Sequence, residues 1–389
     1  MVTDFKIARI PVIHFGCGKV RMLVEILKQY EGKVLIVLSK SLASDSLQIK
    51  SLESDLHKAK IPVEIVYVHG EPGVSTINDI SGLYRNSSIK AICGIGGGSV
   101  IDTAKAVSAM LLEAGSVEYY LEGVGTKSVT GKRIPLIAVP STAGTGAEAT
   151  KNAVISKTGS AGYKKSLRHD NYIPDIALID PELCLCCPPE ITASSGMDAF
   201  TQLLESYLST NASPFTDALA LKGLAAIRDS LLTAFFDGQN LNARADMSFA
   251  ALLSGITLAN AGLGVVHGFA SSVGGCFDIP HGVICGTILA EVNKANMNEI
   301  SLMENTLQKE KMLVLAALFI PEPGLSDGER LKRFSDLIFN WTEKLKLPKL
   351  GEYGVMESDI EAIINITDQK FNPVKLSPKV LREILTNRI

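Results

Sequence analysis

The sequence lacks several features that would place it in a specialised class of protein. None of its 389 residues fall in a stretch of roughly 18 uninterrupted apolar residues, the length typical of a membrane-spanning helix. The N-terminal segment has no apolar run and carries an acid at Asp4, so we expect no signal peptide. A formal net charge of -3 offers no basic surface to nucleic acid. We therefore expect neither a membrane nor a nucleic acid as a partner.

A disulfide framework is also missing. The seven cysteines are odd in number and irregularly spaced, which is typical of a protein from a reducing compartment. We therefore expect a cytoplasmic protein. The remaining composition, with 46% hydrophobic and 20% charged residues, is that of an ordinary globular chain, and the length indicates two domains.

The first 185 residues alternate short β-rich runs with helical stretches. The predicted strands span 33–38, 62–68, 91–95 and 135–139, and helical patterns between them include 42–58 and 76–84. This alternation predicts a parallel sheet covered by helices on both faces.

The rest of the chain shows only helical patterns, at 196–209, 214–236, 244–261, 301–318 and 327–345. Proline is dense between residues 181 and 192, which favours a domain boundary there. The sequence thus predicts an α/β dinucleotide-binding domain over 1–185 and an all-α domain over 186–389.

A glycine-rich loop follows the predicted strand 91–95. Gly97 and Gly98 allow a phosphate to approach the backbone, and the helix that follows offers free N–H groups and the positive end of its dipole. Ser99 is predicted to cap this helix and to donate to a phosphate. The spacing is not that of the GxGxxG fingerprint, and a simple tight turn is the alternative interpretation.

A second loop with hydroxyls and glycines, PSTAGTGAE, follows the strand 135–139. Ligands of open α/β sheets bind at the carboxyl ends of the strands, which is where both loops are expected. Thr142 and Thr145 are therefore candidates for hydrogen bonds to a cofactor.

Four polar residues in the second half are candidate metal ligands. Asp198 and Gln202 are four residues apart and so share one face of a predicted helix, while His267 and His281 lie in glycine-flanked segments. Asp and His are suitable ligands for zinc or ferrous iron. A buried structural histidine is the alternative for each of the two, and sequence spacing does not decide between these interpretations.

Five ordered motifs resemble those of the iron-containing (group III) alcohol dehydrogenase family: GGGSVIDTAK, PSTAGTGAEAT, GMDAFTQ, NAGLGVVHGFA and DIPHG. The resemblance implies the dehydroquinate synthase-like fold of that family, with a dinucleotide-binding domain followed by a helical domain. It also implies NAD or NADP, a divalent metal (iron or zinc) and a homodimer.

The resemblance also assigns roles to individual residues. Implied cofactor contacts are Gly97, Gly98, Ser99 and Asp102 of the first motif, Thr142 and Thr145 of the second, and Lys165 near the ribose. Implied metal ligands are Asp198, His267 and His281.

The chain departs from the family pattern at three positions. Gln202 replaces a histidine ligand, and an amide oxygen binds a metal more weakly than an imidazole does. Ser271 stands where the family often has a second histidine, which puts a proton relay there in doubt. Ser39, followed by Lys40, replaces an Asp that contacts the adenine ribose, so we expect the enzyme to accept NADP(H).

These patterns predict hydride transfer between NAD(P)(H) and a small alcohol or aldehyde, assisted by the metal as a Lewis acid. Two alternatives remain open. One is a related activity on the same fold, such as a polyol or glycerol-phosphate dehydrogenase or a dehydroquinate synthase. The other is a catalytically silent nucleotide-binding homologue. The sequence identifies no general acid.

Overall fold

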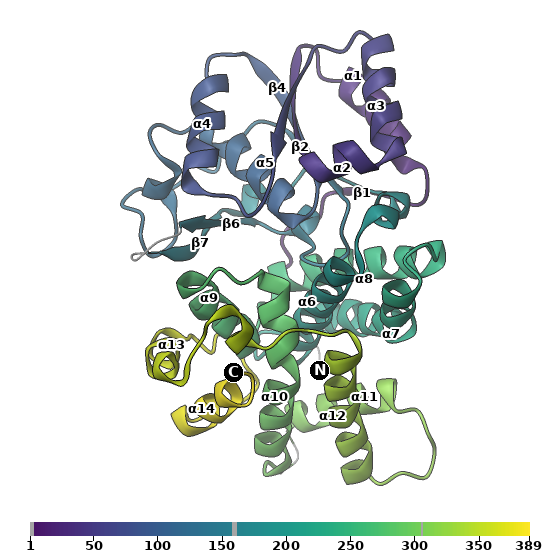
Figure 1. Cartoon of the computed structure of the whole chain (residues 1–389), viewed down its shortest axis with the longest axis vertical. Coiled ribbons are helices and arrows are strands. Elements are labelled where there is room, and N and C mark those ends of the chain that lie inside the picture. Colours follow the sequence, from purple (N-terminus) through teal and green to yellow (C-terminus); the bar gives the residue numbers. More distant parts are fainter. Residues whose placement is uncertain (1–3, 158–161, 305) are drawn as a thin grey trace. The chain divides into compact units, whose positions relative to one another are not determined.

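The computed structural model describes residues 4–157, 162–304 and 306–389. The chain divides into two compact units. We call Ala8–Pro188 together with Gly238–Ser248 the sheet unit, and the remaining described residues the helical unit. Strands lie in the first and only helices and loops in the second (Figure 1).

The sheet unit is built on six parallel strands in the order β1-β8-β5-β4-β2-β3. They are β1 (Val12–Phe15), β2 (Lys33–Ser39), β3 (Val63–Val68), β4 (Ile89–Gly96), β5 (Leu136–Pro140) and β8 (Ile176–Ile179). The chain passes from β2 to the edge strand β3 and returns to β4, on the other side of β2. The order of the strands therefore reverses between β2 and β4, and open sheets bind ligands at such a point.

Helices cover both faces of this sheet, because alternate residues of a strand point to opposite sides. Val34, Ile36 and Leu38 of β2 pack with α1 (Leu23–Lys28) and α3 (Leu47–Lys58). The intervening residues, Leu35 and Val37, pack on the other side with α4 (Val74–Tyr84) and α5 (Gly98–Met110). Both cores consist mainly of aliphatic side chains, which explains the uninterrupted apolar runs of the strands.

The four predicted strands are confirmed, but other parts of this unit differ from the prediction. The continuous helix over 42–58 is wrong, because α2 (Lys40–Asp45) ends before Ser46, whose hydroxyl accepts a hydrogen bond from Ile49 N (3.3 Å) and starts α3. Two short strands, β1 and β8, and the antiparallel hairpin of β6 (Asn152–Lys157) and β7 (Tyr163–Arg168) were not predicted.

The helical unit confirms the predicted all-α character. Its helices are α6 (Pro189–Leu208), α7 (Pro214–Phe236), the later part of α8 (Leu241–Ala261), α9 (Val265–Cys276), α10 (His281–Ser301), α11 (Leu307–Phe319), α12 (Asp327–Lys344), α13 (Ile360–Ile366) and α14 (Pro378–Thr386). No strand occurs among described residues 189–304 and 306–389. A helix starting at Ser301 is wrong, since this residue ends α10 and Thr306 caps α11 by accepting from Lys309 N (3.3 Å).

The early part of α8 belongs to the sheet unit. Arg244 donates hydrogen bonds to the carbonyls of Gly238 (2.9 Å) and Cys187 (3.0 Å), and Gln239 donates to that of Leu185 (3.1 Å). The bonds to Cys187 and Leu185 hold Gly238–Ser248 against the end of the segment Ala8–Pro188.

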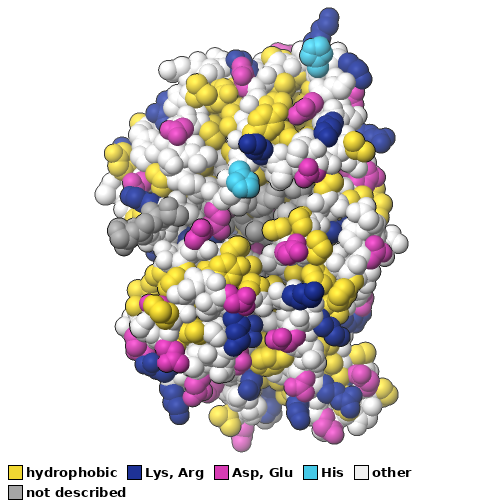
Figure 2. Space-filling model, in the orientation of Figure 1, with side chains coloured by type: hydrophobic (Ala, Val, Ile, Leu, Met, Phe, Trp, Pro, Cys, Tyr) yellow, Lys and Arg dark blue, Asp and Glu magenta, His cyan; other side chains and the backbone are white. Residues whose placement is uncertain are grey.

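The charge distribution on the surface bears on binding of nucleic acid, and the helix lengths bear on contact with a membrane. Acidic and basic side chains are interspersed over the face shown in Figure 2. No single helix of the described chain is long and apolar enough to cross a membrane, and one sharply bent pair, α8 with α9, meets the criterion by length and composition only.

Candidate cofactor loops and metal centre

Three of the predicted cofactor segments meet at one edge of the sheet. Strands β2, β4 and β5 are neighbours, with Leu38 paired to Ile95 and Gly96 to Pro140. The segments that follow these strands therefore leave the sheet side by side. Ser39 at the end of β2, the glycine loop after β4 and the Thr142–Thr145 loop after β5 thus lie at the place where the strand order reverses.

The glycines of the first loop leave room for the threonines of the second. A Cβ atom on Gly98 would lie 2.5 Å from Thr145 Oγ1, and one on Gly97 would lie 3.3 Å from Thr142 Oγ1. Both distances are shorter than an ordinary van der Waals contact. The two loops thus present glycine backbone and threonine hydroxyls together, a combination suited to phosphate.

Helix α5 begins at this loop, but not as predicted. Its N-cap is Gly97, and Ser99 lies inside the first turn, so the prediction that Ser99 caps the helix is wrong. The backbone N–H groups of the first turn have no acceptor within an α-helix and point toward its N-terminal side. Gly98 and Ser99 are therefore placed to donate to an anion through their main chain.

Ser39 is the last residue of β2 and the N-cap of α2. Its hydroxyl accepts a hydrogen bond from Leu42 N (3.4 Å) and lies 3.0 Å from Ser41 Oγ. Lys40 is the first residue of α2 and is exposed. A Cβ on Gly96 would lie 3.0 Å from Ser39 Cβ, so Ser39 borders the glycine loop.

Of the two remaining predicted cofactor contacts, Asp102 is partly buried and Lys165 is exposed. One carboxylate oxygen of Asp102 lies 3.4 Å from the buried Nζ of Lys105, and the other accepts from Val154 N (2.9 Å). Lys105 also donates to the carbonyls of Ala147 and Asn152. Asp102 and Lys105 thus join α5 to the β6 hairpin, whereas Lys165 is exposed on β7.

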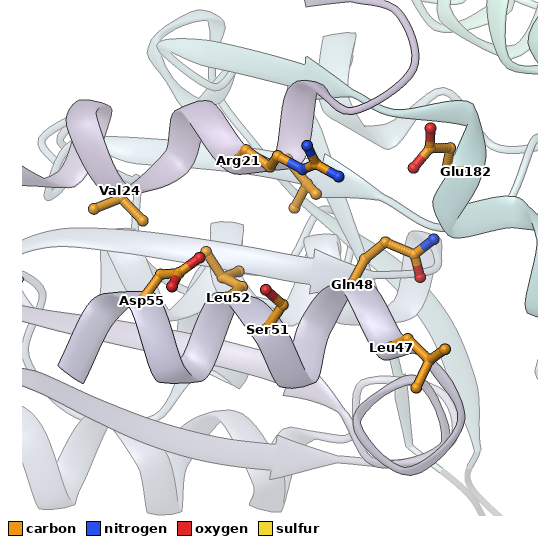
Figure 3. A pocket seen from close by; sticks show the side chains of 9 residues that line it. Arg21, Val24, Leu47, Gln48, Ser51, Leu52, Asp55 and Glu182 are labelled. Carbon is orange, nitrogen blue, oxygen red and sulfur yellow. The ribbon is translucent and has the colours of Figure 1, made fainter. Parts of the chain in front are cut away.

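The sheet unit also contains a separate cavity of about 240 Å3, with α1 and the short 3-10 helix η1 (Lys19–Met22) on one side and α3 on the other (Figure 3). Its lining residues are Val20, Arg21, Val24, Leu47, Gln48, Ser51, Leu52, Asp55 and Glu182. None of them is a predicted cofactor contact, so this cavity plays no part in the site described here.

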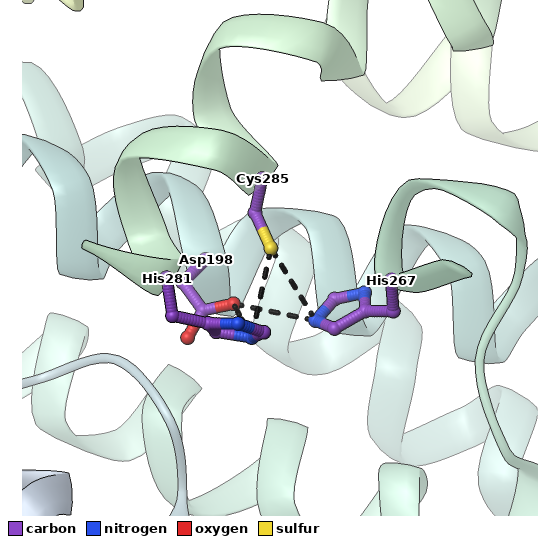
Figure 4. A group of neighbouring side chains, drawn as sticks. All are labelled: Asp198, His267, His281 and Cys285. Atoms are coloured by element: carbon purple, nitrogen blue, oxygen red, sulfur yellow. Dashed lines mark hydrogen bonds and ion pairs between the residues drawn. The ribbon is translucent and has the colours of Figure 1, made fainter. Parts of the chain in front are cut away.

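The predicted metal ligands of the helical unit meet in space. Asp198 comes from α6, His267 from α9 and His281 from the first residue of α10, and their side chains point toward one another (Figure 4). Asp198 Oδ1 lies 3.3 Å from His267 Nε2 and 3.7 Å from His281 Nε2. Cys285 joins the three, and one donor atom from each of the four residues lies within 4.8 Å of the others.

The carboxylate of Asp198 provides the test of whether a metal fits. Its side chain is only 2% exposed, and its Oδ1 makes no hydrogen bond to any described residue although two imidazole nitrogens lie close by. A buried carboxylate oxygen without a hydrogen bond is costly unless a cation compensates for it. The side chain of His281, 28% exposed, leaves the cluster partly open to solvent. The residues present therefore fit a divalent metal.

Comparison with known proteins agrees with these features. The profile of the family "Iron-containing alcohol dehydrogenase" matches residues 11–181, and that of "Fe-containing alcohol dehydrogenase family, C-terminal" matches residues 192–387. The chain belongs to the iron-containing alcohol dehydrogenase family. The predicted resemblance is thereby confirmed.

Individual members of this family resemble the chain over almost its full length. Long-chain-alcohol dehydrogenase 1 of Geobacillus thermodenitrificans is 31% identical over 375 residues, 96% of this chain and 92% of the relative. 1,3-Propanediol dehydrogenase of Citrobacter freundii is 32% identical over 382 residues, 95% of each chain. A crystal structure of 1,3-propanediol oxidoreductase is 29% identical, covers 100% of both chains and superposes with a TM-score of 0.87.

Two buried residues of this family member were missed by the sequence analysis. Glu205 accepts from His267 Nδ1 (2.7 Å) through one oxygen and from Val266 N (2.7 Å) through the other. The carboxylate therefore fixes the ring of His267 so that Nε2 faces Asp198. The second missed residue is Cys285. Sequence spacing carried a signal for both, because Glu205 is seven residues after Asp198 and Cys285 four after His281, each on one helix face.

The structure also shows where the two unusual residues lie. Gln202 is buried, and its amide oxygen accepts a hydrogen bond from Ser254 (2.9 Å). Ser271 is exposed, and its hydroxyl donates to the carbonyl of His267 (2.8 Å).

The pKa values of the cluster reflect its charges. Burial raises the pKa of Asp198, but the neighbouring His281 and His267 outweigh burial and hold this pKa below its usual value. Burial lowers the pKa of His267, yet Cys285, Asp198 and Glu205 together raise it well above the usual value. Burial also raises the pKa of Cys285 to about 11, against the opposing effect of His267. The site thus favours positive charge at its centre, which is what a cation site requires.

Proposed function

We propose that this protein is an NAD(P)-dependent, metal-containing alcohol dehydrogenase, or aldehyde reductase, that acts on a small alcohol or aldehyde. The observation that supports it most is the buried Asp198 oxygen without a hydrogen bond, which faces two imidazole nitrogens in a member of this enzyme family. A divalent ion, iron or zinc, supplies Lewis-acid polarisation of the substrate oxygen when bound.

The helical unit supplies the ligands in this proposal. Asp198 provides negative charge, and His267 and His281 provide imidazole nitrogens. Glu205 holds His267 in the orientation and tautomer that leave Nε2 available. A fourth protein ligand comes from Gln202 or from Cys285, and the two can be distinguished by experiment.

The sheet unit supplies the cofactor contacts. Gly97, Gly98 and Ser99 offer main-chain N–H groups to the pyrophosphate, and Thr142 and Thr145 offer hydroxyls beside them. The remaining proposed contacts to NAD or NADP are Ser39, Lys40, Asp102 and Lys165. The nicotinamide ring supplies or accepts the hydride when the cofactor is bound.

Ser271 does not take over the proton relay of a histidine in this proposal. A hydroxyl has no pKa near neutrality, and this one already donates to a main-chain carbonyl. We therefore assign no side chain as general acid.

The test removes the metal and one ligand. The purified protein is stripped with a chelator, reloaded with Fe(II) or Zn(II), and assayed on small aldehydes with NADH and with NADPH. Stripping should abolish turnover, and Asp198→Ala should lose both bound metal and activity, whereas Asp336→Ala, an exposed site on α12, should keep both. Full activity in the metal-free enzyme would contradict the proposal.

The same experiment separates the alternatives. A dehydroquinate synthase-like enzyme would turn over a cyclic phosphate and leave aldehydes unchanged. A silent homologue would bind nucleotide, retain no metal and turn over neither substrate.

A further inference from the structure

Four of the six distances between the donor atoms in the metal centre are close to those of a tetrahedral site, and all six are within 4.8 Å. Around zinc, ligand bonds of about 2.0–2.1 Å to nitrogen or oxygen and 2.3 Å to sulfur place N or O donors about 3.3 Å apart and S and N donors about 3.6 Å apart. Asp198 Oδ1 lies 3.3 and 3.7 Å from the Nε2 atoms of His267 and His281. Cys285 Sγ lies 3.7 Å from each of the same two atoms.

Cys285 is also placed as a ligand should be. It lies one turn after His281 on α10, so the two side chains project from the same helix face, and Figure 4 shows its sulfur directed at both rings. The residue is completely buried. A surface thiol that captures metals nonspecifically would not have this environment.

The possible donor atom of Gln202, unlike the sulfur of Cys285, is not directed at the two histidine rings in any contact of the described structure but is engaged by another residue. The amide oxygen is the only atom of Gln202 that could bind a cation, and it accepts the 2.9 Å hydrogen bond from Ser254. To act as a ligand, the oxygen would have to keep this donor while also facing the metal.

We propose that Cys285, rather than Gln202, is the fourth protein ligand, so that the metal is held by Asp198, His267, His281 and Cys285. This inference rests on the proposed function only in requiring that a metal occupies the site. The thiol loses its proton to solvent as the metal–sulfur bond forms. The loss of the family's histidine at position 202 is thus compensated from another helix.

A sulfur ligand changes which metal the site prefers. Thiolates are soft donors that suit zinc, and zinc lies above ferrous iron in the general order of divalent affinities. The site therefore prefers zinc to iron more strongly than a site made only of nitrogen and oxygen donors.

Cobalt(II) tests the ligand directly, because a Co(II)–thiolate bond gives a sulfur-to-metal charge-transfer band in the near ultraviolet, apart from the visible d–d bands. The full-length protein is stripped and loaded with Co(II), and its spectrum is compared with those of Cys285→Ser and Gln202→Leu. We expect the charge-transfer band in the native protein and in Gln202→Leu. In Cys285→Ser the band should be lost, and zinc affinity should fall more than about tenfold, since even partners outside the ligand set cost this much.

A matched control keeps the result specific. Cys276→Ser, at an exposed cysteine of α9, should retain the band. If a variant fails to fold, the native spectrum alone can still contradict the role of Cys285. Visible d–d bands without a charge-transfer band would overturn the role of Cys285 and leave the metal site intact. A protein that binds no cobalt would contradict the metal-dependent function itself.

Discussion

In the sheet unit, the proposed cofactor contacts lie mostly in segments that directly follow a strand, whereas in the helical unit the candidate ligands come from three different helices. Neighbouring parallel strands bring their carboxyl ends together, so the fold alone assembles Ser39, the glycine loop and the threonine loop. Asp198, His267 and His281 are joined only by the packing of α6, α9 and α10. A site at the ends of parallel strands is therefore positioned by the strand order. A site between helices forms only when each helix packs in the correct position along its neighbours.

The two units also use buried charge differently. Asp102 and Lys105 of the sheet unit satisfy each other and the main chain of the β6 hairpin. In the helical unit, the Oδ1 atom of Asp198 has no such hydrogen bond. The buried charged groups of one unit are thus hydrogen-bonded to the main chain, whereas in the other unit a buried carboxylate oxygen is left without a hydrogen bond.

The largest effect expected from this difference between the units is a pH dependence of stability caused by Glu148. This residue lies three positions after Thr145 in the sheet unit. Burial raises its pKa from 4.5 to about 7, so the folded protein binds more protons than the unfolded chain between these pH values. Stability from this group is present below pH 4.5 and is lost as the pH rises through about 7. The loss amounts to about 3 kcal/mol, since one pKa unit corresponds to 1.36 kcal/mol.

The measurement is denaturant unfolding of the native protein and Glu148→Gln at pH 5 and pH 8. The neutral glutamine should make the variant relatively more stable at pH 8 than at pH 5. If the difference in free energy of unfolding between the two proteins is the same at both pH values, Glu148 is charged in the folded state at both, as a carboxylate with compensating partners would be.

A smaller effect, on zinc affinity, is expected at Glu205 of the helical unit, whose buried charge we expect to support metal binding. In Glu205→Gln, one of the two N–H donors from Val266 and His267 loses its carboxylate acceptor, and the ring is oriented less firmly. Zinc affinity, measured by competition with a chelator, should fall about 10- to 100-fold, as for other carboxylates that orient a ligand histidine. Glu310→Gln, at an exposed site on α11, serves as the control. If zinc affinity stays the same while the protein becomes less stable, Glu205 is only a structural residue.

The smallest effect concerns Ser39 and the choice between NADP(H) and NAD(H). An aspartate here can still cap α2, but it repels the 2′-phosphate of NADPH. Ser39→Asp should lower the ratio of kcat/KM for NADPH over NADH about tenfold, which corresponds to about 1.4 kcal/mol. The neutral Ser39→Asn should change the ratio less. A native enzyme that uses only NADH would show that the alignment at Ser39, or the role proposed for it, is wrong.

Much of the main sheet was predictable because four of its strands, β2 to β5, have five to eight residues each and are mostly apolar. Strands β2, β3, β4 and β5 were located from sequence, whereas β1 and β8 have only four residues each and give too little pattern. The break at Ser46 was missed because the apolar periodicity continues across it. A single side-chain cap decides that break, and periodicity does not register it.

The metal centre was predictable only through resemblance. Asp198, His267 and His281 occur in recognisable motifs, but nothing in their spacing brings three helices together. Glu205 and Cys285 were missed because each resembles an ordinary residue of an amphipathic helix until the opposing helices are in place.

The division of α8 between the units has a consequence for synthesis of the chain. Arg244 and Gln239 tie Gly238–Ser248 to carbonyls of Cys187 and Leu185, so the sheet unit contains a segment made after α6 and α7. A nascent chain released as far as Pro188 still lacks this segment. The sheet unit therefore cannot finish folding before the other unit has begun to emerge from the ribosome, and a gene fragment cut at the proline-rich boundary would encode an incomplete unit.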